Sequence, residues 1–190
     1  MNKIGITGGI GSGKSMVATI LKLFGIPVYI ADIESKRLTD TSPFIRANLI
    51  QLFGENLYTE KGLDRKLLAS HIFSHPDKLK QVNAIIHPVI NKHYLDWVAK
   101  QSTPYCAIES AILFESGFNQ IVDTTLLIYA PLEMRIQRAT LRDKQPREEI
   151  IRRINNQLSD EIKKERSNYV IFNDGKRALL PQITNFLSRL

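Results

Sequence analysis

Residues 8–15 read Gly-Gly-Ile-Gly-Ser-Gly-Lys-Ser and match the pattern G-x-x-x-x-G-K-[ST] in full. In such a segment the glycines let the backbone turn tightly, so that consecutive N–H groups point at phosphate oxygens beside the N-terminus of the next helix. Lys14 would reach the β- and γ-phosphates, and the Ser15 hydroxyl would contact Mg²⁺. The segment therefore predicts a nucleoside triphosphate site. The alternative, a glycine-rich turn without a ligand, is disfavoured by the strand-to-helix context.

Asp32 directly follows the second short apolar run of the chain, residues 26–30. In open parallel sheets, ligands bind outside the carboxyl ends of the strands, so Asp32 is expected beside the phosphate loop. A carboxylate there could accept the proton of an attacking hydroxyl or help to hold Mg²⁺. The spacing equally allows an N-cap for a helix that starts near Ile33.

Two further acidic residues, Glu109 and Glu115, end or follow the third expected strand on the same edge. Either could contact magnesium-bound water or the substrate. Pairing with a basic neighbour, or simple exposure, explains each of them equally well.

Arg135, Arg138 and Arg142 recur at spacings of three and four residues in an expected helix over residues 132–142, which places all three on one side. Arginines delivered together can neutralise the oxygens of a phosphoryl group in transfer. A solvated basic stripe is the alternative interpretation.

These residues require a parallel sheet to bring them together. Residues 3–7 predict the first strand, 14–24 its helix and 26–30 the second strand, and this completes a β-α-β unit. Further strands are expected at residues 105–109, 124–129 and 169–172, with helices after the last two.

The stretch from residue 33 to about residue 101 contains helical punctuation and no further convincing strand. The helix boundaries are expected at Ser42-Pro43, Gly54, Asp64, Pro76 and Pro88. This predicts a helical insertion between the second and third strands. Residues 139–167 are polar and helical.

The composition is that of an ordinary globular chain: 190 residues, 43% hydrophobic and 24% charged, with a formal net charge of +7. No apolar stretch is long enough to span a bilayer, and the phosphate loop lies where a signal peptide would need its apolar run. A cytoplasmic location is therefore expected. The only cysteine, Cys106, is expected to be a buried structural thiol. Nucleic-acid binding is disfavoured because glutamates intersperse the basic residues and aromatic residues do not.

In this order and spacing, the motifs resemble the dephospho-CoA kinase family along the whole chain. The matching segments are residues 6–15, Ala31-Asp32, Phe53-Gly54, Leu63-Asp64-Arg65, 87–90, 113–115, Arg138, Arg142-Asp143, Arg153-Ile154, Gln157 and 169–173.

The resemblance implies an α/β P-loop NTPase fold of the nucleoside-monophosphate-kinase type, with a five-stranded parallel sheet flanked by helices. It implies one kinase domain, residues 1–190, in three parts. The parts are a core of residues 1–32, 102–138 and 168–190, a helical insertion of residues 33–101 that receives the CoA portion, and a small lid of residues 139–167.

The same resemblance implies transfer of the γ-phosphoryl group of ATP to the ribose 3′-hydroxyl of dephospho-CoA, with Mg²⁺. Catalytic roles fall on Asp32 as the base and on Lys14, Arg138 and Arg142, and Mg²⁺ contacts fall on Ser15 and Asp32. The expected nucleotide contacts are Gly9, Gly11, Ser12, Gly13, Lys14, Ser15, Met16 and Asn173. Asp32, His87 and Glu115 are expected at the acceptor, although His87 could instead cap a helix that starts at Pro88.

The sequence departs from the family pattern at Met16, where Thr is usual, at residues 110–112 and at Asn168. Met16 offers no hydroxyl to the α-phosphate. The alternative functions are another small-molecule or nucleoside-monophosphate kinase of the same fold and a nucleotide-dependent switch protein. The expected partner is the small-molecule acceptor, with no nucleic acid or membrane, and the chain is expected to be a monomer or a weak homo-oligomer.

Overall fold

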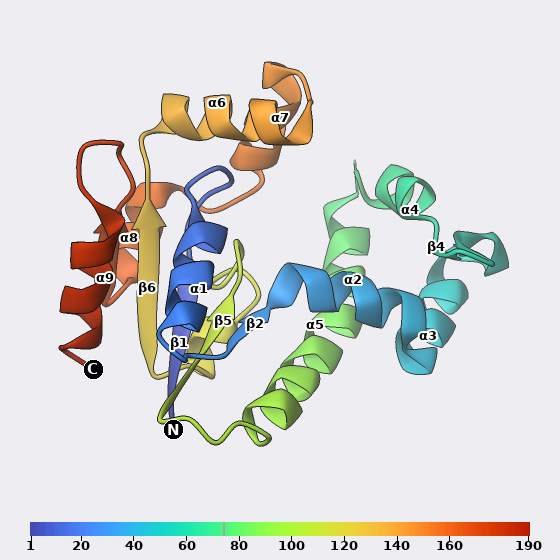
Figure 1. Cartoon of the computed structure of the whole chain (residues 1–190). Coiled ribbons are helices and arrows are strands. Elements are labelled where there is room, and N and C mark those ends of the chain that lie inside the picture. Colours follow the sequence, from blue (N-terminus) through green and yellow to red (C-terminus); the bar gives the residue numbers. More distant parts are fainter. Residues whose placement is uncertain (74) are drawn as a thin grey trace. The chain divides into compact units, whose positions relative to one another are not determined.

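The computed structural model describes residues 1–73 and 75–190 of the chain (Figure 1). The chain forms two compact units, of which the first combines residues 1–30 with 101–190 and the second contains residues 31–100. Each unit is described by itself.

The first unit is built on a parallel sheet. Within the described residues, five strands follow the order β2-β5-β1-β6-β7, and every pairing is parallel. The strands are β1 (Asn2–Thr7), β2 (Val28–Ile30), β5 (Tyr105–Glu109), β6 (Thr124–Tyr129) and β7 (Tyr169–Phe172). The predicted five-stranded parallel sheet is confirmed, and the last three strands agree with the sequence prediction residue for residue.

Helices α1 (Lys14–Leu23) and α9 (Leu179–Leu187) pack together against one face of this sheet (Figure 1). Their apolar side chains meet Ile4 and Ile6 of β1, both fully buried. Gly5 points to the opposite face, because neighbouring strand residues alternate, and a Cβ there would contact Leu113 after β5. Cys106 is fully buried in β5, as predicted.

The segment after β6 is helical. It contains α6 (Leu132–Asp143), α7 (Arg147–Asn155) and α8 (Asp160–Arg166), and a short 3-10 helix, η2 (Phe118–Gln120), precedes β6. Helices α6 and α7 share a small apolar cluster in which Ile136, Ala139 and Ile150 are buried, and Ile10 of the phosphate loop packs on the same cluster. The turn between the two helices contains Lys144, whose φ of 52° lies in the left-handed region.

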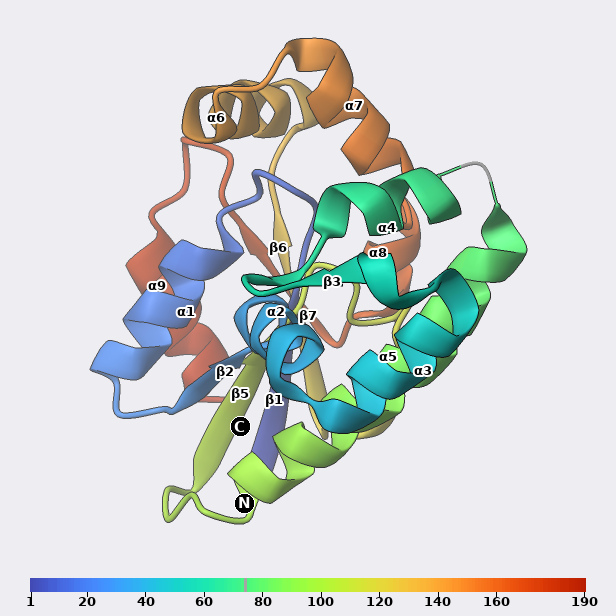
Figure 2. The same cartoon turned by 90° about the vertical axis from the view of Figure 1, so that its right-hand side faces the viewer.

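The second unit is mainly helical and also contains a small hairpin (Figure 2). Its elements are α2 (Ala31–Thr41), α3 (Pro43–Phe53), η1 (Glu55–Leu57), β3 (Tyr58–Thr59), β4 (Gly62–Leu63), α4 (Arg65–Ile72) and α5 (Pro76–Val98). Ser42 and Asp64 cap α3 and α4 with their side chains, as the sequence indicated. The expectation of no strand in this stretch is wrong, because β3 and β4 pair antiparallel. Two-residue strands are too short to show an alternation of apolar and polar residues.

Helix α5 also corrects the expected boundary at Pro88, which lies inside this helix of 23 residues. Val82, Ile90 and Tyr94 are its buried residues, and they lie on both sides of the proline. Packing of this continuous apolar face outweighs the lost N–H of Pro88. His87 is therefore not an N-terminal cap. No helix in the described part of the chain is long and apolar enough to cross a membrane.

Candidate active site

The phosphate loop connects β1 to α1 at the carboxyl edge of the sheet. Gly13 is the N-cap residue of α1, with φ of 97°, and its carbonyl accepts hydrogen bonds from the N–H groups of Met16 and Val17. Gly11 also has a positive φ, 79°, and a Cβ at this position would meet the backbone of Arg135. The glycine spacing therefore serves both the left-handed turns and the close approach of neighbouring chain.

Lys14 and Glu109 form the charged centre of this edge. The Lys14 ammonium lies 3.4 Å from the Gly9 carbonyl oxygen and 3.8 Å from a carboxylate oxygen of Glu109. Both residues are buried, at 8% and 4% exposure. Glu109 ends β5 and is in register with Ile6 of β1. Of the alternatives for Glu109, the structure supports burial against a basic neighbour.

The remaining loop side chains differ in exposure. Ser12 is buried, and its hydroxyl has no hydrogen-bond partner among the described residues. Ser15 and Met16 are exposed at the start of α1. The Ser15 hydroxyl and the Glu109 carboxylate are oxygen donors of the kind that Mg²⁺ prefers, and this ion keeps several waters and needs only one or two protein ligands.

Asn173, after β7, reaches the phosphate loop. Its side-chain amide donates to the Ser12 carbonyl at 2.8 Å, and its backbone N–H donates to the Tyr129 carbonyl at 2.7 Å. Arg138 of α6 donates to the Asn173 carbonyl at 3.1 Å. The structure thus brings the predicted residues Asn173 and Arg138 together at the loop.

The three arginines of α6 have different environments. Arg135 is 4% exposed and forms an ion pair with Asp160, so a solvated stripe is wrong for this residue. Arg142 donates to Asp143, which also accepts from Arg153 at 2.7 Å. These two guanidinium groups hold the pKa of Asp143 down to about 2, the Arg142 hydrogen bond being the larger cause. Asp143 is also the main cause of the raised pKa of Arg142, to which the negative charge of Glu109 adds.

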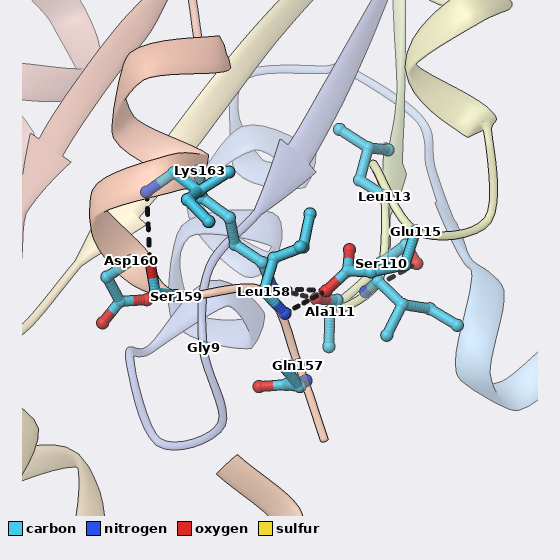
Figure 3. Close-up of polar contacts among 12 residues, drawn as sticks. Gly9, Ser110, Ala111, Leu113, Glu115, Gln157, Leu158, Ser159, Asp160 and Lys163 are labelled. Atoms are coloured by element: carbon cyan, nitrogen blue, oxygen red, sulfur yellow. Dashed lines mark hydrogen bonds and ion pairs between the residues drawn. The ribbon is translucent and has the colours of Figure 1, made fainter. Parts of the chain in front are cut away.

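Glu115 is held by α8 and the segment before it (Figure 3). One of its carboxylate oxygens accepts the Leu158 N–H at 2.8 Å and lies 3.2 Å from the Lys163 ammonium. Lys163 is fully buried and also donates to the Ala111 carbonyl at 2.7 Å. Burial lowers the pKa of Lys163, and Glu115 partly offsets this effect. Pairing with a basic neighbour, one of the alternatives for Glu115, is what the structure shows.

Asp32 and His87 belong to the second unit. Helix α2 starts at Ala31, so the exposed Asp32 lies in its first turn and is not the N-cap that the sequence allowed. His87 is half-buried in α5, and burial lowers the pKa of its imidazole. The ring is therefore neutral near pH 7.

A parallel sheet with the order 2-5-1-6-7, a phosphate loop on its central strand and a buried lysine–carboxylate pair is the construction of a P-loop kinase. Comparison with known proteins gives the same class and a narrower family. The family model described as dephospho-CoA kinase matches residues 2–178.

The relatives cover nearly all of the chain. A dephospho-CoA kinase of Bacteroides fragilis is 47% identical over 189 residues, which are 99% of this chain and 92% of that protein. A crystal structure from Thermus thermophilus is 34% identical with a TM-score of 0.85, covering 100% of this chain and 97% of the other. Dephospho-CoA kinase from Campylobacter jejuni is 25% identical with a TM-score of 0.70, covering 99% and 96%. The chain belongs to the dephospho-CoA kinase family.

Proposed function

We propose that this chain transfers the γ-phosphoryl group of ATP to the ribose 3′-hydroxyl of dephospho-CoA, giving CoA and ADP. The observation that carries the proposal is the family match over residues 2–178, on a chain whose phosphate loop is complete. The hydroxyl oxygen forms a bond to the γ-phosphorus while the bond from that phosphorus to the β,γ-bridging oxygen breaks. The hydroxyl proton passes to a base and ADP leaves.

The nucleotide contacts belong to the phosphate loop in this proposal. Gly9, Gly11, Ser12 and Gly13 of the loop and Ser15 and Met16 of the first turn of α1 are the proposed phosphate contacts, because a glycine-rich loop at a helix N-terminus binds phosphate. Lys14 contributes its ammonium, and Asn173 is the proposed contact of the adenine ring. Ser15, with Asp32 as the second proposed ligand, would hold Mg²⁺, which when bound neutralises charge on the phosphate oxygens. We assign to the buried Glu109 the role of orienting magnesium-bound water, on the ground that it ends the strand beside β1.

Asp32 is the proposed base for the 3′-hydroxyl. Its support is its place two residues after β2, whose carboxyl end lies on the same edge of the sheet as the phosphate loop. A carboxylate that is exposed on a helix start is free to meet a substrate hydroxyl. His87, as a neutral imidazole, and Glu115 are the other proposed acceptor contacts.

Three functional parts are proposed: the core, an acceptor-binding insertion of residues 33–101 and a lid within residues 139–167. The contacts favour a moving part of the lid that is smaller than this range. Residues 157–167 are anchored by the buried Lys163 and by the ion pair of Asp160 with the buried Arg135, whereas α7 carries exposed ion pairs. We place the closing segment at residues 144–156, next to Arg138 and Arg142, whose charges would meet the phosphoryl group in transfer.

The proposed partner is the small-molecule acceptor, with no nucleic acid. We further propose that the protein is cytoplasmic and is a monomer or a weak homo-oligomer. Acidic partners of the basic residues support this proposal, since Arg147 and Arg152 pair with Glu133 and Glu149. Binding of DNA or RNA below 1 µM at about 150 mM salt would contradict it, because ordinary non-specific binding is about 10⁻⁴ to 10⁻⁶ M.

A direct test measures ADP release by the purified protein with dephospho-CoA, AMP, CMP or shikimate as acceptor. Of these four acceptors, we expect only dephospho-CoA to be turned over. Mass spectra and phosphorus NMR spectra of the product should show the new phosphate on the 3′-oxygen. Equal or faster turnover with another acceptor would favour a different kinase of the same fold. MgATP binding without turnover of any acceptor would favour a nucleotide-dependent switch.

A further inference from the structure

The outer arm of the phosphate loop is held by two side chains distant in sequence. The Ile10 N–H donates to Oε1 of Gln157 at 3.1 Å, and the Ile10 carbonyl accepts from Nε of Arg135 at 3.0 Å. We name this pair of hydrogen bonds the Ile10 clamp. The contacts join residues separated by 147 and 125 positions in the sequence.

Each bond of the clamp fixes the opposite end of its peptide group, because N–H and C=O point in opposite directions across a trans peptide. Gln157 holds the Ile10 N–H outward, which turns the Gly9 carbonyl inward, where it accepts from Lys14 at 3.4 Å and from the Ser12 N–H at 3.1 Å. Arg135 holds the Ile10 carbonyl, which turns the Gly11 N–H away from Arg135. The clamp therefore sets the direction of one phosphate-loop donor and the seat of the lysine.

Arg135 and the segment that carries Gln157 have further contacts. Arg135 is 4% exposed, and its guanidinium also pairs with Asp160. Its side chain lies against Gly9 and its backbone against Gly11, since a Cβ on either glycine would overlap with it. Beside Gln157, the Leu158 N–H is bound by Glu115, and Glu115 is held by the buried Lys163 (Figure 3).

From this arrangement we propose that Arg135 and Gln157 are positioning residues that pre-form the phosphate loop for MgATP, with Asp160, Glu115 and Lys163 as their support. The proposal rests on the proposed function only in naming ATP as the nucleotide. Preorganisation increases affinity because less conformational freedom is lost on binding. Loss of one neutral hydrogen bond to the loop corresponds to a drop in nucleotide affinity of about tenfold.

The decisive variant is Gln157→Leu, which removes the acceptor for the Ile10 N–H without changing charge. Gln137→Leu is its matched control, because Gln137 is exposed on α6 and the chemical change is the same. Arg135→Lys is the second variant, since it keeps a cation beside Asp160 but loses the planar group that contacts both Asp160 and Ile10. Calorimetry on the full chain gives the Kd for MgADP and for MgATP, and kinetics give KM for each substrate and kcat.

We expect Gln157→Leu and Arg135→Lys each to weaken MgATP about tenfold, with KM for dephospho-CoA within twofold of wild type and Gln137→Leu unchanged. Unchanged nucleotide affinity in both variants would overturn the clamp, whatever their Tm. An equal loss of affinity for MgATP and for dephospho-CoA would also overturn it, because such a result indicates a general loosening of the fold. Should Gln157→Leu fail to fold, Arg135→Lys alone decides in the same way. Wild-type protein that binds MgATP but does not phosphorylate dephospho-CoA would refute the proposed function, and the calorimetric Kd values of the variants and of the Gln137→Leu control would still test the clamp.

Discussion

Replacement of Asp32 by Asn separates a catalytic role from a structural one. The structure places Asp32 in the first turn of α2, exposed, with Glu34 in the same turn. Loss of one negative charge near a helix N-terminus costs about 0.3–1 kcal/mol. For a chain of 190 residues this lowers the Tm by at most about 4 °C. Removal of a general base, in contrast, lowers the rate by about 10²- to 10⁴-fold.

The expected result for Asp32→Asn is therefore a kcat at least about 10²-fold lower, equivalent to about 2.7 kcal/mol in the barrier, with a small change in Tm. The Kd for MgATP should stay within about threefold of wild type, because most of the proposed nucleotide contacts belong to the phosphate loop. Initial rates of ADP release, calorimetric MgATP binding and thermal melts on the same preparation give all three quantities.

Glu34→Gln is the matched control, since it removes a charge from the same helical turn. Glu34 also pairs with Arg37 at 2.8 Å, so this control should show a change in Tm at least as large and a kcat close to wild type. The base assignment is refuted if Asp32→Asn retains kcat within threefold of wild type. An equal effect of both variants on kcat would point instead to the field at the helix start.

Three further predictions concern the first unit. Lys14→Met should lower kcat by at least about 10²-fold, because the ammonium that contacts the phosphates is lost. It should also lower Tm, because the buried Glu109 loses its 3.8 Å contact. Activity near wild type would contradict the phosphate-loop assignment. Asp143→Asn should lower the free energy of unfolding by at most about 2 kcal/mol at pH 7, since the pKa of this carboxyl falls from 3.8 to about 2 in the folded chain. A depressed folded pKa stabilises above about pH 4, so the difference in urea unfolding should be constant from pH 5 to 7 and shrink as the pH falls toward 2; a constant difference at all pH values argues against it. Hydrogen exchange should slow in residues 144–156 only when nucleotide and acceptor are both present, with residues 157–167 protected throughout. Arg138→Ala and Arg142→Ala should lower kcat more than they lower the affinity for MgATP. The lid hypothesis is wrong if ligands do not change the exchange and neither variant changes kcat.

The central sheet could be predicted because its signal is local. Buried parallel strands are largely apolar runs, and residues 105–109, 124–129 and 169–172 are short runs of this kind. The helix caps Ser42 and Asp64 could be predicted for the same reason, since a capping side chain acts within three residues of its own position. The hairpin β3–β4 and the passage of α5 through Pro88 depend on tertiary packing and left no local signal.

The residues of the candidate site likewise fall into those with a local sequence signal and those without one. The phosphate loop is contiguous in sequence, so its residues were predictable from spacing alone. The burial of Lys163 depends on Ala111, 52 residues away, and that of Arg135 on Ile10, 125 residues away. One signal could have found Arg135: it precedes Ile136 by one residue and Ala139 by four, on the buried face of α6. A charged residue on the apolar face of an amphipathic helix requires a partner.

Differences in burial are the reason why the proposed lid has an anchored part and a part that is expected to move. The side chains of Arg135 and Asp160 are 5% and 10% exposed, and those of Lys163 and Glu115 are 0% and 21% exposed. Breaking such pairs costs about 3–5 kcal/mol where both partners are buried, because a charge is left without compensation. The pairs of α7 are different, since Arg147 and Glu133 are 49% and 72% exposed, and pairs of this kind contribute at most about 1 kcal/mol. In the proposed lid motion, separation of α7 from α6 would also break the Arg153–Asp143 pair, whose side chains are 48% and 20% exposed, and the apolar contact of Ile150, worth about 2–3 kcal/mol, while residues 157–167 keep the Ile10 clamp in place.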